Sequence, residues 1–180
     1  FIPAKIAVVI SSREDAYGLK RAEAHGLETC YIGAGNYPDP NLRTEKILDV
    51  LRKKQIDLVV LAGYMSILDQ KIVEAYRNQI INIHPSLIPS FCGKGFYGKR
   101  VHQAVLDYGA KVTGATVHFV DEGTDTGPII LQKAVEVKEN DTAETLAQRV
   151  LVVEHELLPL AVKLFAEGRL HVEGRRVKIK

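Results

Sequence analysis

The sequence predicts an α/β fold in a single domain spanning residues 1–180, with a parallel sheet in the N-terminal half and an antiparallel hairpin in the C-terminal half. Up to residue 84, short apolar runs alternate with helical patterns, which is typical of parallel strands joined by crossover helices on both faces of a sheet. Two long strand-like segments then follow each other across a short stretch rich in turn residues. That stretch is too short to hold a crossover helix, so the two strands are expected to pair in antiparallel fashion.

The N-terminal half begins with an apolar run at residues 5–10, KIAVVI, of the kind found in strands buried on both faces. Ser11 and Ser12 are suited to cap a helix that continues to about residue 24, and Gly26 is suited to end it. The remaining predicted elements of this half are strands at 27–32, 58–61 and 80–84, a loop at 33–40, and helices around 47–51 and 69–77.

The C-terminal half opens with a loop at 91–98, FCGKGFYG, and a helix at 99–107 that Gly109 ends. Its two long strands are predicted at 112–120 and 129–137, joined by a turn that contains DEGTDTGP. A single long helix is expected at 142–165, capped by Thr142 or Asp141, with an apolar stripe at Leu146, Val150, Val153, Leu157 and Val162. A weak strand is expected at 170–172.

Composition and charge indicate an ordinary globular protein. Hydrophobic residues make up 46% of the 180 residues and charged residues 26%, with a net charge of +2, so nothing suggests a nucleic-acid partner. The basic end at 175–180 is expected to be a solvated tail. Cys30 and Cys92 have neither a disulfide framework nor metal-ligand spacing. The sequence shows no signal peptide and no membrane-spanning run, so a cytoplasmic protein without a membrane partner is expected.

Polar residues gather where predicted strands end. Asn82 and His84 alternate at the end of the 80–84 strand, so both side chains point to the same face. Asp125 lies in the turn of the hairpin, and His118 precedes that turn. Each has a simpler structural interpretation: His84 and Asn82 as strand-end or loop-tying groups, Asp125 as a turn residue, and His118 as a core residue.

Taken together, these residues favour acyl transfer. An amide donor, an imidazole and a carboxylate at the same end of one sheet are suited to stabilise a developing oxyanion. No Ser or Cys stands in a nucleophile-elbow sequence, so the nucleophile is expected to come from the substrate. A metal site would require His118 to converge with His84 and Asp125, and is the least favoured interpretation.

An ordered set of motifs resembles the glycinamide ribonucleotide formyltransferase family of folate-dependent formyltransferases. The motifs are DAYGL at 15–19, LAGYM at 61–65, NIHPSLIP at 82–89, GKG at 93–95, TGATVHFV at 113–120 and DTGP at 125–128. The resemblance covers essentially the whole chain. It implies a formyltransferase-type Rossmann-like sheet and transfer of a formyl group from 10-formyltetrahydrofolate to the primary amine of glycinamide ribonucleotide, in purine biosynthesis.

The resemblance also implies roles for individual residues. Asn82 and protonated His84 would stabilise the oxyanion, while Asp125 would keep His84 charged and assist proton movement. Gly63 and Glu154 would bind the ribonucleotide, with Glu154 at its amine. The folate co-substrate, with no metal required, would contact Tyr64, Met65, Ser66, Ile67, Leu68, Val73, Asn82, Val120, Asp121, Glu122 and Asp125. The partners implied are these two small molecules, and the enzyme is expected to be a monomer or a homodimer.

The sequence departs from the family pattern at three places. Ser66 stands where many members have Arg, and Leu151 where some have a polar residue near the substrate. The family's first strand, its Gly-Ser-Asn-type loop and the following helix have no counterpart here, and that loop holds the substrate phosphate. We therefore expect that the sequence is not the whole functional chain.

Three other functions compete with this one. A formyltetrahydrofolate deformylase would use water as acceptor, but it typically has His in place of Pro85 and a regulatory domain. A methionyl-tRNA formyltransferase would carry a C-terminal tRNA-binding domain. A non-catalytic folate-binding module is the alternative from another class, and the missing phosphate loop is its best support.

Overall fold

The computed structural model describes residues 1–180, which form two compact units. One unit comprises Lys5–Gln79, and the other comprises Ile80–Lys180 together with Phe1–Ala4. Each has its own strands and helices and is described by itself. That residues 1–180 act as a single domain stays a prediction.

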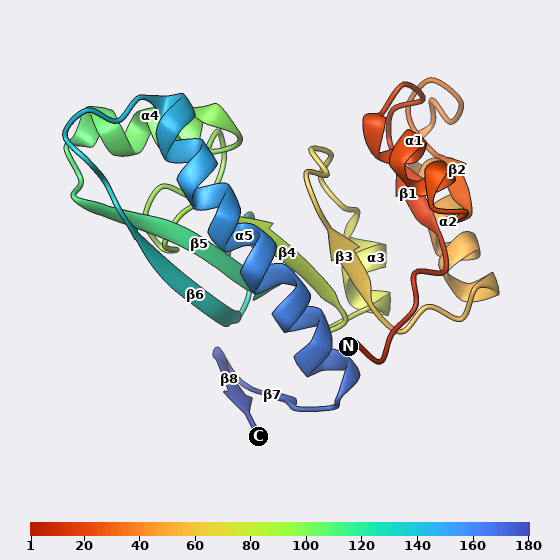
Figure 1. Cartoon of the computed structure of the whole chain (residues 1–180). Helices are drawn as coiled ribbons and strands as arrows, with labels where there is room; N and C mark the ends of the chain where they lie inside the picture. The colour runs from red at the N-terminus through yellow and green to blue at the C-terminus, as the bar shows by residue number, and fades with distance from the viewer. The chain divides into compact units, whose positions relative to one another are not determined.

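The unit Lys5–Gln79 alternates short strands and helices, as the sequence predicts (Figure 1). Strands β1 and β2 pair in parallel, with Val9 opposite Thr29 and Ser11 opposite Tyr31, so the parallel pairing predicted for this half is confirmed here. The elements are β1 (Val9–Ser11), α1 (Tyr17–Ala24), β2 (Thr29–Tyr31), α2 (Pro40–Lys53), β3 (Val59–Leu61) and α3 (Gln70–Ala75).

The beginning of this unit differs from the sequence prediction. Strand β1 starts at Val9 rather than at residue 5, and its residues are half-buried rather than buried on both faces. Helix α1 starts at Tyr17, and its N-cap, Ala16, makes no side-chain cap bond. The predicted Ser11 cap was wrong because the Ser11 hydroxyl is engaged in a turn, where it accepts from the Arg13 amide at 3.0 Å. Gly26 does follow the helix end, with φ of 68°.

The other two helices of this unit each begin after an Asp residue that caps them. The Asp39 side chain accepts from the Asn41 amide at 2.8 Å and caps α2, with Pro40 at the first helical position. Asp69 caps α3 in the same way through the Lys71 amide. Helix α2 buries Ile47 and Leu48, which lie on the predicted apolar stripe.

The unit Ile80–Lys180 is built on an almost entirely antiparallel sheet. Its strands follow the order β4, β5, β6, β8, β7, and the only parallel contact among them joins β6 to β8. The predicted hairpin is confirmed as β5 and β6. The elements are β4 (Ile80–His84), α4 (Lys99–Tyr108), β5 (Val112–Phe119), β6 (Ile129–Glu136), α5 (Ala143–Ala166), β7 (Leu170–Glu173) and β8 (Arg176–Ile179).

The core of this unit lies between α5 and the strands β4, β5 and β6, which the helix crosses (Figure 1). From the helix, Leu146, Val150 and Val153 are buried, as the predicted stripe requires. From β5, Val117 and Phe119 are buried. Thr142 caps α5 by accepting from the Thr145 amide at 3.2 Å. The helix therefore fixes one face of the strands that carry the polar cluster described below.

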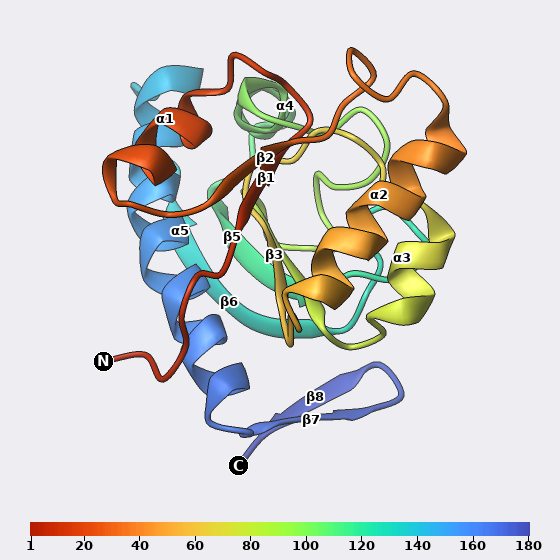
Figure 2. The same ribbon diagram turned by 90° about the vertical axis from the view of Figure 1, so that its right-hand side faces the viewer.

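The basic C-terminal end is part of the sheet rather than a solvated tail. Residues 170–179 form a hairpin of β7 and β8 that follows the end of α5 (Figure 2). Strand β8 pairs in parallel with β6 at Ile129 and Arg176. The tail prediction was wrong because the alternation of Arg176, Val177, Lys178 and Ile179 is too short to identify a strand, and pairing with β6 and β7 supplies the order.

None of the helices is both long and apolar enough to cross a lipid bilayer.

Candidate active site

Strand pairing brings three polar side chains to the end of β4. Asn82 and His84 alternate along the strand, as predicted, and β5 pairs with it so that Asn82 lies opposite His118. Residues directly opposite each other in an antiparallel pair share a face of the sheet. His118 therefore lies on the Asn82 and His84 face, a placement that follows from the register and not from its own sequence.

His84 is buried, with 4% of its surface exposed, and both of its ring nitrogens face acceptors. Nε2 lies 2.9 Å from the Phe91 carbonyl oxygen, which it can contact favourably only as a donor. Nδ1 lies 3.6 Å from Oδ2 of Asp125. Both ring nitrogens of His84 therefore lie against oxygen atoms, one of which belongs to a carboxylate.

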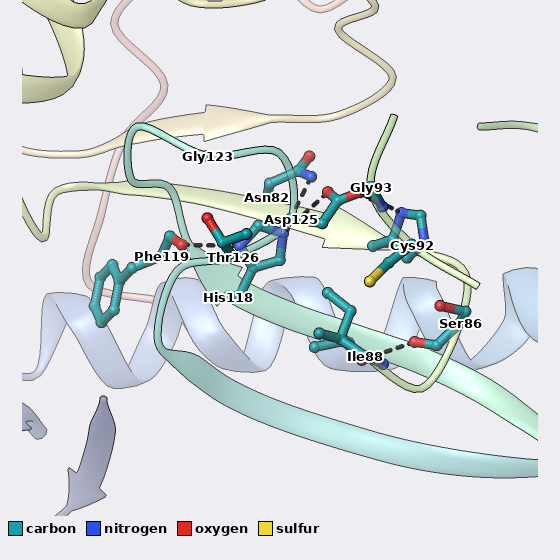
Figure 3. Close-up of polar contacts among 12 residues, drawn as sticks. Asn82, Ser86, Ile88, Cys92, Gly93, His118, Phe119, Gly123, Asp125 and Thr126 are labelled. Atoms are coloured by element: carbon teal, nitrogen blue, oxygen red, sulfur yellow. Dashed lines mark hydrogen bonds and ion pairs between the residues drawn. The ribbon is translucent and has the colours of Figure 1, made fainter. Parts of the chain in front are cut away.

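His118 makes polar contacts through both ring nitrogens. Nδ1 lies 2.8 Å from the Phe119 carbonyl oxygen and so donates to it. Nε2 lies 3.4 Å from the Asn82 amide nitrogen and 3.6 Å from Oδ1 of Asp125. The Asn82 amide group is thereby turned toward the cluster and keeps a second N–H for another acceptor (Figure 3).

Asp125 lies at the centre of the cluster, with 11% of its side chain exposed. Its Oδ2 accepts from the Gly93 amide at 3.0 Å, and Figure 3 shows Asn82, His118 and Gly93 gathered around its carboxylate. Burial alone would raise the pKa of Asp125. The His118 ring, the Gly93 amide and the charge of His84 outweigh that effect, so the pKa lies below the usual value for Asp.

The segment that carries Asp125 is tightly folded. The Asp121 side chain accepts from the Gly123 amide at 3.0 Å and from the Thr126 hydroxyl at 2.5 Å. A side chain at Gly127 would meet the Phe119 carbonyl oxygen at 1.7 Å, so only glycine fits there. The Asp121 side chain therefore helps to hold the shape of this segment. Val120 and Asp121 are half-buried, and Glu122 is exposed.

The segment after β4 is fixed to the neighbouring strands. The Thr116 hydroxyl donates to the Ser86 carbonyl at 2.7 Å and accepts from the Ile88 amide at 3.1 Å. Gln132 Nε2 donates to the Ile88 carbonyl at 2.9 Å. These bonds position the chain that leads to Phe91 and Gly93, the two backbone partners of the cluster.

Cys92 lies beside the cluster without the properties of a nucleophile. Burial raises the pKa of its thiol, and the nearby Asp125 charge raises it further. The thiol, 3.4 Å from the Pro89 carbonyl oxygen, is therefore held in the protonated form.

Glu154 projects from α5 and is half-buried. Burial raises the pKa of its carboxyl to about 7. A carboxyl that ionises near neutral pH is suited to bind an amine, although its role stays a prediction. Leu151, on the same helix, is 45% exposed.

Six of the predicted folate-side residues, at positions 64–68 and 73, belong to the unit Lys5–Gln79. Burial raises the pKa of Tyr64, and a hydrogen bond with Ser66 partly offsets the effect. Met65 and Ile67 are 64% and 92% exposed, and Leu68 is half-buried. Val73 is buried within α3. Gly63 has φ of 67° and open space around its Cα. Their contacts with a ligand stay predictions.

The predicted trio thus converges in one unit, together with groups that sequence reasoning did not assign to it. From sequence alone His118 can be a core or a metal-binding residue, and only the β4–β5 register places it against Asn82. His118, His84 and Asp125 do converge, but they do not make a group with metal-binding geometry. The Gly93 contact is made by a backbone amide, so no side chain marks it in the sequence. Only the GKG motif, which begins at Gly93, indicates the position.

Comparisons with known proteins agree with this geometry. Residues 2–162 match the model of the formyl transferase family. Phosphoribosylglycinamide formyltransferase from Bacillus subtilis is 39% identical over 160 residues, which is 89% of this chain and 80% of that protein. The chloroplastic enzyme of the same name from Arabidopsis thaliana is 42% identical over 92% of this chain, but the chain spans only 57% of its length.

The chain is also similar in fold to a solved structure. The crystal structure of glycinamide ribonucleotide transformylase 1 from Symbiobacterium toebii superposes with a TM-score of 0.92 at 47% identity, covering 99% of this chain and 82% of that one. The family match extends over most of the chain and includes every member of the polar cluster. The chain belongs to the formyl transferase family.

Proposed function

We propose that this protein transfers a formyl group from 10-formyltetrahydrofolate to the primary amine of glycinamide ribonucleotide. The observation that carries the proposal is the convergence of Asn82, His84 and Asp125 in one buried cluster, with His118 beside them. The names of the relatives reported above support the choice of substrates. The function would place the protein in purine biosynthesis.

The chemistry follows from the groups available. The substrate amine attacks the formyl carbon, and the carbonyl oxygen becomes an oxyanion. The free N–H of Asn82 would donate to that oxygen, and the charge of His84 would stabilise it. In this arrangement the Nε2–H of His84 stays on the Phe91 carbonyl, so the ring contributes mainly through its charge.

Collapse of the tetrahedral intermediate breaks the bond from the formyl carbon to the folate nitrogen. A proton leaves the attacking amine and is delivered to the departing nitrogen, so the transfer balances without an added acid or base. Ionised Asp125 would keep His84 charged and relay this proton. The amine is the only nucleophile in the scheme, which agrees with the protonated thiol of Cys92.

The ligand contacts belong to the same proposal. Tyr64, Met65, Ser66, Ile67, Leu68 and Val73 would contribute to folate binding together with Val120, Asp121 and Glu122, while Gly63 and Glu154 would bind the ribonucleotide. Activity as a monomer or homodimer in the cytoplasm is a further part of the proposal. The Arabidopsis relative is named as chloroplastic, so the compartment depends on the cell that makes the protein.

One assay separates the candidate functions. The purified protein is given 10-formyltetrahydrofolate and glycinamide ribonucleotide, and the products are identified by mass spectrometry. We expect formylated ribonucleotide and tetrahydrofolate in equal amounts, with turnover unchanged by a chelator. Formate released without transfer would favour the deformylase instead, and folate binding without turnover would favour a binding module.

A further inference from the structure

We propose that Arg175 is a positioning residue for formyl transfer, which holds the segment carrying Asp125 from the tip of the β7–β8 hairpin. This inference rests on the function proposed above. It concerns a residue outside the cluster, in the part of the chain that the sequence predicts to be a solvated tail.

Asp125 needs external support because its backbone is in an unfavourable conformation. Its φ is 57°, in the left-handed region, which residues with a side chain seldom adopt. The direction of its carboxylate depends on that conformation. The bonds from Asp121 to Gly123 and Thr126 close the segment on itself, but they tie it to no other element.

Arg175 supplies a bond from a different element. Its Nη2 donates to the Thr126 carbonyl oxygen at 2.9 Å, and Thr126 directly follows Asp125. A hydrogen bond from a charged donor is stronger than one between neutral groups. It restrains the peptide unit next to the strained residue.

The hairpin itself is fixed beside this segment. Arg176, the neighbour of Arg175, pairs with Ile129 at the start of β6, where the chain leaves the Asp125 segment. Across the hairpin, Glu173 pairs with Arg176, so Gly174 and Arg175 form the turn between the strands. A two-residue turn leaves little freedom, and the Arg175 side chain therefore starts from a defined position.

The test compares kcat, KM and the pH profile of the full chain with those of the Arg175→Ala variant. Misplacing a reacting group by 1 Å can lower turnover about a hundredfold, and a partial displacement should lower kcat about tenfold. KM for both substrates should change little. The acid limb of the kcat profile should move to higher pH, because a displaced Asp125 loses contact with the Gly93 amide and protonates more readily.

Two further variants separate positioning from general stability. Arg175→Lys keeps a charged donor and should restore part of kcat. Lys178→Ala removes a cation of the same hairpin that pairs only with Glu173, at 2.7 Å, and should leave kcat and the acid limb unchanged. An equal loss in Lys178→Ala, or an acid limb that does not move in Arg175→Ala, would overturn the positioning role.

Asp125→Asn, measured in parallel, keeps the two claims apart. If Asp125→Asn is inactive while Arg175→Ala and Arg175→Lys match the unmodified protein, the inference about Arg175 fails and the proposed function stands. If Asp125→Asn is fully active, the proposed function fails first. Should Arg175→Ala not fold, Arg175→Gln gives the same comparison, because it keeps part of the aliphatic stem and removes the charge.

Discussion

Asp125 shows how a single residue acquires its properties from backbone neighbours. Its left-handed conformation directs the carboxylate to the Gly93 amide and toward the two imidazole rings. The sequence predicts Asn82, His84 and Asp125 because an amide, an imidazole and a carboxylate recur within an ordered set of family motifs. It does not predict the contact of Asn82 with His118, since strand register depends on side-chain packing across the whole sheet.

Glu154 provides a prediction at the same scale. Its pKa is near 7 in the folded protein and near 4.5 when unfolded, so the folded state favours the protonated form. The contribution of Glu154 to the free energy of unfolding should therefore be most favourable below about pH 4.5 and decline as the pH rises through 7. Glu154→Gln should raise Tm at pH 8 by a few degrees, since 1 kcal/mol corresponds to about 2–4 °C for a chain of this size.

The control for Glu154 lies on the same helix. Glu156 is exposed and pairs with Lys133 at 2.7 Å, so Glu156→Gln should change Tm little at either pH. Calorimetry at pH 5 and pH 8 measures both variants. The account of Glu154 would be wrong if Glu154→Gln lowered Tm at pH 8, or if its gain were the same at both values of pH.

At the scale of single elements, α5 has the clearest sequence signals for its start. Thr142 and Thr145 form a reciprocal cap, and Asp141 receives two bonds from Arg149, at 2.7 Å and 2.8 Å. The Arg149 guanidinium holds the pKa of Asp141 well below its usual range. The sequence predicts this helix start within one residue, because cap residues and apolar stripe agree.

Removing the guanidinium should therefore destabilise the protein. Hydrogen bonds to charged groups contribute about 1.5–3 kcal/mol, so Arg149→Met should lower the free energy of unfolding at pH 7 by about 2 kcal/mol. The Asp141 side chain is only 3% exposed and would lose its cation. The pair contributes fully to stability above the usual Asp pKa. Its contribution is lost progressively as the pH falls from there toward the lowered pKa of Asp141 in the folded state.

Urea denaturation of Arg149→Met at pH 7 and pH 3 measures this effect. Lys133→Met breaks an exposed pair and serves as the matched control, with an expected change under about 1 kcal/mol. If both variants lost the same free energy of unfolding at pH 7, the Arg149–Asp141 pair would contribute no more than an exposed ion pair.

Other elements could not be predicted as well, for physical reasons. Helix α1 begins six residues after Ser11, because the Ser11 hydroxyl bonds within a turn instead of capping a helix. Strand β8 alternates polar and apolar residues over only four positions, and its order comes from pairing with β6 and β7. Both failures concern segments whose structure is decided by partners distant in sequence or by competing local bonds.

At the scale of the whole molecule, the polar cluster is contained in the unit Ile80–Lys180. The strand order, the hairpin and the segment after β4 together place an amide, two imidazoles and a carboxylate at one end of the sheet. The sequence motifs identify most of these groups, and the fold adds the backbone partners. The geometry of the cluster suits acyl transfer, and family membership narrows the proposal to formyl transfer.

The most direct measurement of that claim is the turnover of Asp125→Asn. The amide keeps the shape of the side chain but removes the charge that faces His84. We expect kcat to fall at least about a hundredfold, the range of acid–base groups, with an unchanged dissociation constant for the folate and an unchanged circular dichroism spectrum. A variant that binds the folate and turns over at nearly the original rate would contradict the account.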